Sequence, residues 1–313
     1  MTTPLRAVLP SPSHTPNKEP LSSAAHISTP PLAIPTPAPH NTPVTDTNPT
    51  PPPLAATPIE VASSLPPRPN LPGSVVLRAT VEDLIDSMAA DLLFHARNCV
   101  RAFGDFHLAL SGGGTPEPFY RRLMYDPNYR DLPWKRTHLW IVDERRVDPD
   151  DDRSNFKMIR ETLVVHSDIP REQVHPIPAL ADDADTRYEA ELKETLAWRE
   201  KGHDRLDYTL LGMGADAHTA SLFPHSPALE SQGRLVAINA GPTVTPPDRI
   251  TMTFDLLNAS RFIAVMVTGE KKRDTIARIA ALKRANPAEL PITGIQPIGG
   301  ELRWYLDAAA VPA

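Results

Sequence analysis

The sequence that decides how this chain is interpreted is the apolar segment Leu206-Asp207-Tyr208-Thr209-Leu210-Leu211 followed by Gly212-Met213-Gly214-Ala215-Asp216-Ala217-His218-Thr219-Ala220-Ser221-Leu222-Phe223-Pro224. The apolar segment is typical of a buried strand, and the two glycines after it permit backbone angles closed to other residues and let a ligand approach the main chain. Asp216 and His218 then place a carboxylate and an imidazole two residues apart. We predict that this turn is a site and that His218 is its catalytic base. The alternative is that His218 caps a helix starting near Thr219 or satisfies a hydrogen bond in the core.

Apolar and amphipathic segments alternate along the chain on both sides of this turn. Thr80 and Asp83 resemble a capping arrangement at one helix start, and Ser154 is a predicted N-cap at another. The predicted strands are 74–79, 106–110, 138–142, 206–211, one beginning at 249–253, and 261–268. The predicted helices are 80–103, one opened by Pro116, one capped by Ser154, 185–198 and 270–284. The alternation predicts an α/β fold with a doubly wound, mostly parallel sheet covered by helices on both faces.

The first part of the chain differs in composition from the rest. Residues 1–72 contain 20 of the 37 prolines, with many serines and threonines and almost no aromatic residues. Such a segment cannot bury enough apolar surface to offset its chain entropy, so we predict a disordered extension followed by one catalytic domain at 73–313. The serines and threonines of the extension leave a transit peptide as an alternative, but the few arginines and the lack of amphipathic periodicity favour a plain flexible extension. No apolar core typical of a secretory signal follows Arg6. The prolines of the extension make it a candidate for recruiting a protein partner.

Charge and cysteine content exclude several classes of function. The net charge is −6 and no basic run occurs, so we expect no nucleic-acid partner. No stretch of 18 apolar residues is present, so we expect no membrane span. The single cysteine, Cys99, lies on a helical apolar pattern and fits a buried thiol in a reducing compartment, which favours a cytoplasmic location. The acidic run 148–152 lacks the glycine turn of a calcium loop and is interpreted as a solvated surface loop.

The unusual motifs follow the carboxyl ends of predicted strands. In doubly wound sheets ligands bind beyond these ends, so we expect the motifs to converge on one crevice. Ser111-Gly112-Gly113-Gly114-Thr115 leaves main-chain N–H groups free to bind an anion at a helix amino end, although a tight turn without a ligand is the alternative. Arg145 offers a planar fork for phosphate oxygens, unless it belongs to a solvated salt-bridge cluster with Arg146. Arg249 and Lys272 add positive charge at the rim.

Together these motifs resemble the 6-phosphogluconolactonase family, over about residues 75–308. The motifs that carry the resemblance, in the family's order, are Ser111-Gly112-Gly113-Gly114-Thr115-Pro116, Asp143-Glu144-Arg145 with Ser154-Asn155, Gly212 to Pro224, Arg249-Ile250-Thr251 and Thr268-Gly269-x-x-Lys272. The resemblance implies the fold shared with glucosamine-6-phosphate deaminase and ribose-5-phosphate isomerase, hydrolysis of 6-phospho-D-glucono-1,5-lactone in the oxidative pentose phosphate pathway, and no cofactor or metal. Matched by position, it makes His218 the base and Asp216 its neighbour, with the substrate bound by Ser111, Gly112, Gly113, Gly114, Thr115, Gly214, Arg145, Arg249 and Lys272.

Two positions depart from the family's pattern. Ala217 stands where glycine is usual, and a positive φ there would add strain of about 1 kcal/mol. His225 likewise follows Pro224 where glycine is common. Neither change removes a reacting group, so both bear on the geometry of the loop.

Two other functions remain open at this stage. A sugar-phosphate isomerase or deaminase could use the same fold, but the deaminase family carries His-Ile-Ala-Phe-Asn-Glu-Pro and Asp-Glu-Tyr where this chain has His218 to Pro224 and Asp143-Glu144-Arg145. A non-catalytic sugar-phosphate sensor is the other alternative. The presence of both Asp216 and His218 argues against it, since a sensor can lose its base freely.

Overall fold

The computed structural model describes residues 65–241, 246 and 248–312. The predicted disorder and partner binding of the extension concern residues that lie largely outside this part. The predicted boundary at 72/73 stays a prediction, although two residues before it contact the folded part of the chain. Leu71 is buried in the core, and the Pro72 carbonyl accepts a hydrogen bond of 2.9 Å from Nε1 of Trp304. Leu71 and Pro72 therefore pack with the residues that follow them.

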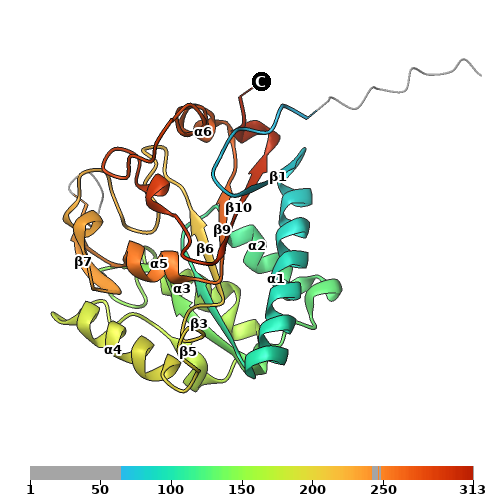
Figure 1. Cartoon of the computed structure of the whole chain (residues 1–313). Helices are drawn as coiled ribbons and strands as arrows, with labels where there is room; N and C mark the ends of the chain where they lie inside the picture. The colour runs from blue at the N-terminus through green and yellow to red at the C-terminus, as the bar shows by residue number, and fades with distance from the viewer. Residues whose placement is uncertain (1–64, 242–245, 247, 313) are drawn as a thin grey trace, which may run out of the picture. The chain divides into compact units, whose positions relative to one another are not determined.

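A seven-stranded parallel sheet forms the centre of the fold (Figure 1). Its strand order is β1-β10-β9-β6-β2-β3-β5, and every neighbouring pair is parallel. The strands are β1 (Ser74–Arg78), β2 (Phe106–Leu110), β3 (Thr137–Ile141), β5 (Val174–His175), β6 (Tyr208–Gly212), β9 (Phe262–Val267) and β10 (Glu301–Asp307). After β2 the chain winds outward through β3 and β5, and after β6 it winds the other way through β9 and β10. The predicted doubly wound sheet is confirmed.

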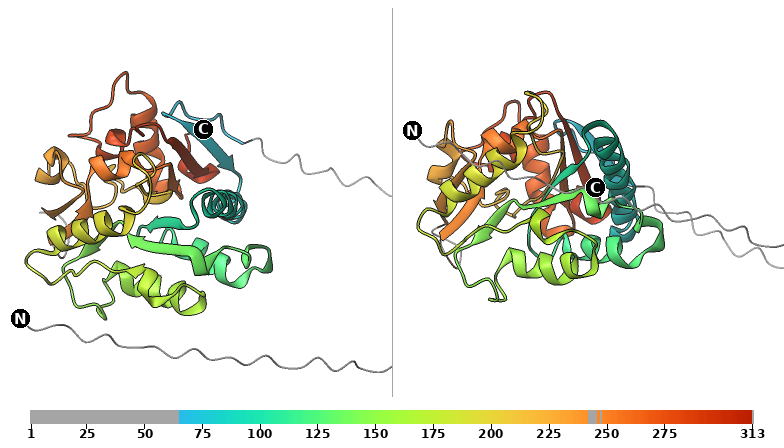
Figure 2. Two further views of the ribbon diagram at one scale, coloured as in Figure 1. Left: turned by 60° about the horizontal axis from the view of Figure 1, so that its bottom comes forward. Right: turned by 90° about the horizontal axis from the view of Figure 1, so that it is seen from below.

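Helices cover both faces of this sheet. The helices are α1 (Val81–Phe103), α2 (Glu117–Tyr125), α3 (Asn155–Thr162), α4 (Ala184–Leu196), α5 (Phe254–Ala259) and α6 (Arg273–Ala280). Helix α1 packs on β1, β10 and β2, α2 packs on α1, and α3 packs on α2. Figures 1 and 2 show α4 and α5 on the opposite side of the sheet from α1 and α2. The crossover helices therefore divide between the faces as two opposite winding directions require.

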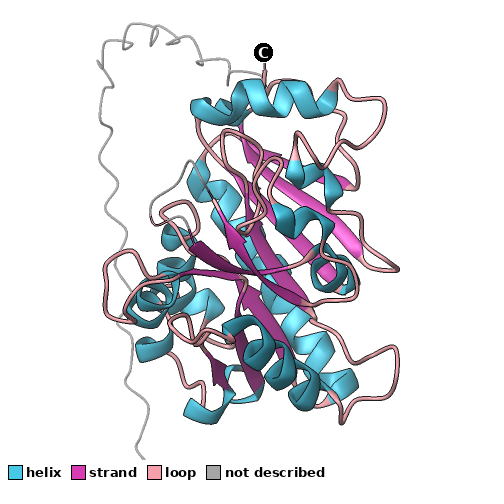
Figure 3. Ribbon diagram, turned by 90° about the vertical axis from the view of Figure 1, so that its left-hand side faces the viewer, coloured by secondary structure: helices cyan, strands magenta, loops and turns pink. Residues whose placement is uncertain are grey.

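A second, three-stranded antiparallel sheet was not predicted. It comprises β4 (Asp143–Arg145), β7 (Val236–Ala240) and β8 (Asp248–Met252) in the order β4-β8-β7, on the side facing the viewer in Figure 3. The sequence indicated Asp143–Arg145 only as the end of the preceding strand. Three residues carry no periodicity of their own, and their partner strand lies about a hundred residues away in the chain, so only the tertiary structure reveals the pairing.

Most helix starts follow the sequence, but one helix is shorter than expected. Thr80 Oγ1 accepts from the Asp83 amide at 3.1 Å, and Ser154 Oγ accepts from the Lys157 amide at 3.0 Å, so both predicted caps are confirmed. The predicted helix 270–284 is instead a 3₁₀ turn, η6 (Glu270–Lys272), followed by α6, which ends at Ala280. There the Leu282 amide bonds to the carbonyl three residues back, which tightens and ends the helix.

The core lies between the sheet and its helices. Strands β2 and β9 are buried along their whole length, as expected for central strands of a parallel sheet. Cys99 is a buried free thiol on α1, as its apolar pattern predicted. Across the described part of the chain, no helix combines the length and apolarity needed to span a membrane.

Candidate active site

The predicted motifs meet in one crevice at the point where the winding of the sheet reverses. Strands β2 and β6 are neighbours there, and their carboxyl ends lead into the Ser111–Thr115 loop and the Gly212–His218 turn. The cavity has a volume of about 310 Å³ and is lined by Ser111, Gly112, Gly113, Gly114, Thr115, Pro116, Asp143, Arg145, Asn155, Gly212, Met213, Gly214, His218, Ala220, Ser221, Phe223, Arg249 and Lys272. All predicted site residues except Asp216 line it. The predicted convergence is confirmed.

Asp216 lies behind His218 rather than in the cavity wall. Its Oδ1 is 2.6 Å from Nδ1 of His218 and also accepts from the His218 amide at 3.2 Å. Burial opposes ionisation of this carboxyl, but the hydrogen bonds from His218 outweigh it and hold the pKa of Asp216 below its usual range. The carboxylate accepts the Nδ1 proton, so Nε2 of the neutral ring is left as a proton acceptor. One third of the His218 side chain is exposed, and its ring leans against Phe223 at 5.0 Å.

Backbone hydrogen bonds hold the turn around this pair. The Gly214 amide donates to the His218 carbonyl at 2.8 Å, and Thr219 Oγ1 donates to the Gly212 carbonyl at 2.9 Å. A Cβ at Gly214 would overlap the His218 ring and the Asp216 carboxylate, so only glycine fits there. No helix starts near Thr219, which forms an isolated bridge with Leu222 instead. The interpretation of His218 as a helix cap is therefore wrong.

Ala217 and His225, which stand where the family usually has glycine, both have a left-handed backbone conformation. Ala217 has φ 66° and His225 has φ 59°. These are angles that glycine adopts without cost and other residues adopt at a cost. Ala217 is fully buried, and the Ile292 amide donates to its carbonyl at 2.9 Å. The strain predicted for Ala217 is thus present, and His225 carries the same kind of strain at the surface.

The glycine-rich loop connects β2 to α2. Gly113 has φ 94°, and a Cβ at Gly112 would overlap the side chain of Asn155, so the loop packs closely on the start of α3. Ser111 Oγ and Asn155 Oδ1 are buried and have no hydrogen-bond partner among residues 65–241, 246 and 248–312. Buried polar atoms normally have partners, so two orphaned oxygens in one cavity wall point to a ligand that supplies them.

The three predicted cations lie in the same wall without carboxylate partners. Arg145 and Arg249 face each other directly across the antiparallel pair β4–β8. Burial and the neighbouring Arg145 lower the pKa of Arg249, and burial lowers the pKa of Lys272. None of the three forms an ion pair within the described part of the chain, although Arg145 Nη1 donates to the Arg153 carbonyl at 2.7 Å. Like charges placed directly opposite are destabilising, so the crevice favours an anion.

Sequence reasoning left three polar side chains of the cavity wall, Asp143, Asn155 and Ser221, out of the site. Asp143 is buried in the wall and accepts a 2.7 Å hydrogen bond from Ser221 Oγ, and Asn155 Nδ2 donates to the Asp143 carbonyl at 2.7 Å. All three belong to the motifs that carried the resemblance, which was the available signal. Glu144 beside them is structural. Burial raises its pKa, while the Phe156, Asn155 and Arg145 amides and Ser154 Oγ all donate to it.

One cluster elsewhere has the spacing of metal ligands. Asp105, His107 and His138 lie together at the amino ends of β2 and β3, away from the crevice. Trp140 Nε1 donates to His107 Nδ1 at 3.0 Å, so the proton of neutral His107 is on Nε2, which faces Asp105 Oδ2 at 3.0 Å. Asp105 also pairs with Arg199. Both ring nitrogens of His107 are thus occupied, and the cluster does not fit a metal ion.

The fold and the crevice define a doubly wound α/β protein with a cavity at its switch point that is lined by three cationic side chains. The family described as glucosamine-6-phosphate isomerases/6-phosphogluconolactonase matches residues 79–304. A 6-phosphogluconolactonase from a Nostoc species is 38% identical over 243 residues, which cover 75% of this chain and 98% of that protein. The solved 6-phosphogluconolactonase from Thermotoga maritima is 26% identical with a TM-score of 0.63, and the match covers 75% of this chain and 99% of that one.

A further relative is the human GDH/6PGL endoplasmic bifunctional protein. It is 37% identical over 242 residues, which cover 75% of this chain but only 30% of the human protein. The matched segment is therefore a fraction of that longer protein, while it spans nearly all of the Nostoc protein. This chain belongs to the glucosamine-6-phosphate isomerase/6-phosphogluconolactonase family.

Proposed function

We propose that this protein is a lactone hydrolase that converts 6-phospho-D-glucono-1,5-lactone to 6-phospho-D-gluconate. The observation that carries the proposal is one cavity lined by His218, which contacts Asp216 behind it, and by three cations that have no carboxylate partner among the described residues. A phosphosugar lactone has the two features that such a cavity suits, an electrophilic ester at one end and a dianion at the other. The family and the 6-phosphogluconolactonases that match this chain support the same choice.

His218 is the proposed general base. Its Nε2 takes a proton from a water molecule as the water oxygen bonds to the lactone carbonyl carbon, and the carbonyl electrons move onto the oxygen to form a tetrahedral oxyanion. The carbonyl then re-forms, the bond from the carbonyl carbon to the ring oxygen breaks, and the imidazolium returns the proton to that oxygen. The Asp216 carboxylate stabilises the imidazolium between the two steps. General base catalysis of this kind contributes about 10² to 10⁴ in rate.

The remaining wall of the cavity positions the substrate. Arg145, Arg249 and Lys272 are the proposed ligands of the phosphate, together with main-chain amides of the loop from Ser111 to Thr115. Binding energy from this distant group would hold the carbonyl near His218. Ser111 Oγ and Asn155 Oδ1, which lack hydrogen-bond partners among the described residues, are available to the hydroxyl groups of the sugar.

A deaminase or isomerase on the same fold is the nearest alternative. That chemistry moves a proton between carbons and needs a carboxylate base in the cavity. Asp143 is a buried carboxylate there, but it already accepts from Ser221. Ammonia release from glucosamine 6-phosphate would favour this alternative. The predicted cytoplasmic location stays a prediction.

The deciding experiment compares hydrolysis of the lactone with and without its 6-phosphate, at low pH to suppress spontaneous opening. We expect the phosphorylated lactone to be the far better substrate and His218→Asn to lose at least about 10²-fold in kcat. His166→Asn is the matched control, because His166 is exposed and does not line the cavity. A His218→Asn variant with near-full activity would refute the assignment.

A further inference from the structure

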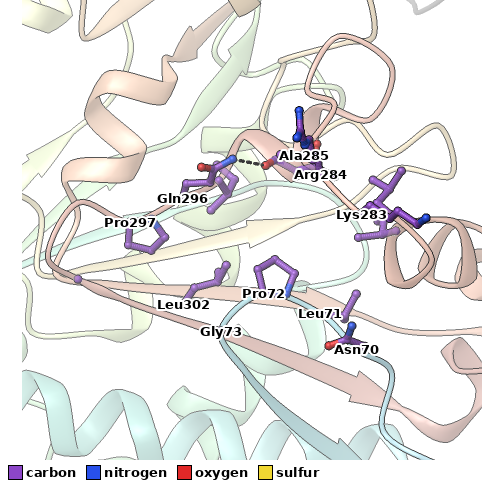
Figure 4. A pocket seen from close by; sticks show the side chains of 15 residues that line it. Asn70, Leu71, Pro72, Gly73, Lys283, Arg284, Ala285, Gln296, Pro297 and Leu302 are labelled. Carbon is purple, nitrogen blue, oxygen red and sulfur yellow. Dashed lines mark hydrogen bonds between the residues drawn. The ribbon is translucent and has the colours of Figure 1, made fainter.

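A second and larger cavity lies outside the crevice. Its volume is about 620 Å³, within the range of small-molecule sites, and Figure 4 shows its lining side chains. Four segments build it: residues 70–73 before β1, the end of α6 and the loop after it at 279–285, residues 293–297, and residues 300–302. In Figure 4, Pro72 and Leu302 lie on one side, with Gln296, Ala285 and Arg284 on the other.

The apolar part of the cavity wall is aliphatic, and Asn70, Thr293 and Gln296 add polar side chains to the lining. Leu71, Ile279, Ile295 and Leu302 contribute buried side chains to it, while Leu282 remains 37% exposed at its edge. The lining residues include no aromatic ring, so the wall offers no stacking surface for a nucleobase or an aromatic ligand. It suits an alkyl chain, which gains affinity from the apolar area it removes from water.

The charge at the cavity is of one sign. Lys283 and Arg284 are its only ionisable lining residues, in a chain whose net charge is −6. Both are exposed, and neither forms an ion pair with any residue that the structure describes. Two cations that form no ion pair in the described part of the chain, beside aliphatic side chains of the cavity wall, are complementary to a ligand with an anionic head and an alkyl body. A carboxylate on a short alkyl chain is the smallest ligand of that kind.

Two of the segments that form the cavity also contact the Gly212–His218 turn, which is called the catalytic turn below. Ile279 lines the cavity from α6, and Thr275 one helical turn earlier donates from Oγ1 to the Ala215 carbonyl at 2.6 Å. The 293–297 wall continues from Ile292, whose amide donates to the Ala217 carbonyl at 2.9 Å. Ala215 and Ala217 flank Asp216, so the elements that form the cavity also hold the backbone of the His218–Asp216 pair.

We propose that this cavity is a second ligand site, for a small aliphatic carboxylate, whose occupant acts on the catalytic turn through α6 and residues 292–297. An occupant that shifts the end of α6 or the 293–297 segment changes the two hydrogen bonds on either side of Asp216. The coupling needs no contact between the two ligands, because both sites share these supporting elements.

The test uses octanoate as the probe and isothermal titration calorimetry on the full chain. We expect one saturable site for octanoate, with octan-1-ol and octylammonium binding at least tenfold more weakly. The double charge reversal Lys283→Glu/Arg284→Glu should weaken octanoate at least tenfold, and Ala285→Trp should abolish binding by filling the cavity. Lys135→Glu/Lys201→Glu reverses two exposed cations outside the cavity and should leave binding unchanged. No saturable binding, or equal binding to the charge-reversed variant, would overturn the site.

The coupling is tested by a signal that does not depend on turnover. The imidazole resonances of His218, assigned by their loss in His218→Asn, should move when octanoate saturates the wild-type protein and stay in place in Ala285→Trp. Bound octanoate with unmoved His218 resonances would overturn the action on the turn. Lactone hydrolysis without octanoate tests the proposed function separately, so the two failures are distinguishable.

Discussion

Nδ1 of His218 and Oδ1 of Asp216 lie 2.6 Å apart although only one residue separates them in the chain. Side chains two apart rarely meet in a strand or a helix, because neither periodicity brings i and i+2 together. Here Gly214 leaves room for the contact, and the positive φ of Ala217 turns the chain back. The contact between His218 and Asp216 therefore depends on the backbone conformation of the turn, and substitutions in the turn can test it.

Asp216→Asn should lower kcat on the order of 10²-fold with little change in KM. The amide cannot stabilise the imidazolium as the carboxylate does, and it can donate to Nδ1 and so leave the proton of His218 on the wrong nitrogen. Steady-state kinetics on the phosphorylated lactone measure the effect. Asp182→Asn removes an exposed carboxylate whose ion pair with Arg146 spans 3.5 Å, and it should retain the wild-type constants. Equal kinetics for the two variants would contradict a role for Asp216.

Gly214→Ala should abolish most activity while the protein stays folded. The added methyl would overlap the ring of His218 and the carboxylate of Asp216, so it would separate the pair. Gly212→Ala is the matched variant, because a Cβ there meets nothing within 4 Å and its φ is not positive. We expect kcat to fall far more for Gly214→Ala than for Gly212→Ala, with both melting curves cooperative. The reverse order would show that the pair tolerates displacement.

Sequence reasoning placed the sheet, its windings and the crevice because each depends on local signals. Buried strands such as Phe106–Leu110 have continuous apolar runs, and the motifs follow their carboxyl ends. It predicted a strand beginning at Arg249 but missed β4, β7 and the second sheet, since the pairing of Asp143–Arg145 with Arg249–Thr251 is a long-range contact without a pattern of its own. The same contact brings Arg145 and Arg249 face to face. From the sequence, Arg145 and Arg249 are predicted as two separate cations. In the structure they form one pair of facing cations.

Lys272→Ala should raise KM for the phosphorylated lactone by roughly 10- to 100-fold, the loss expected for one charged hydrogen bond. The side chain lines the cavity, and burial already lowers its pKa, so its charge is stabilised most when a phosphate is bound. KM for the lactone without phosphate should change little. Lys271→Ala, on the exposed neighbour, serves as the control. An unchanged KM for the phosphorylated substrate would remove Lys272 from the phosphate site.

His225→Gly should raise the free energy of unfolding by about 1 kcal/mol, because glycine adopts its φ of 59° without strain. The variant loses a contact of 3.3 Å with Glu289, but both side chains are more than half exposed and the pair contributes little. Ala217→Gly should gain less, since it also removes a buried methyl group. Urea unfolding at neutral pH compares the three proteins. A less stable His225→Gly would show that the strain is absorbed elsewhere.

His138, near the amino end of β3, should make the protein sensitive to mild acid. His138 stacks between His107 and His175 at centroid distances of 4.6 and 5.3 Å, and burial together with these neighbours lowers its pKa to about 4. In the unfolded chain a histidine titrates near pH 6.5. Between about pH 6.5 and 4 the unfolded state therefore binds more protons, so the free energy of unfolding falls as the pH falls, and the loss is complete below pH 4.

His138→Phe keeps the stacking but cannot titrate, so its free energy of unfolding should depend less on pH across this window, by roughly 1–3 kcal/mol in total. Urea unfolding curves at pH 7, 6, 5 and 4.5 measure the slope for wild type and variant. Comparing slopes separates titration from the lost hydrogen bond to His175 Nε2, which shifts the whole curve at every pH. The exposed His166→Phe is the control for removing a histidine. Parallel slopes for wild type and His138→Phe would mean that protons bind His138 as readily in the folded protein as in the unfolded chain.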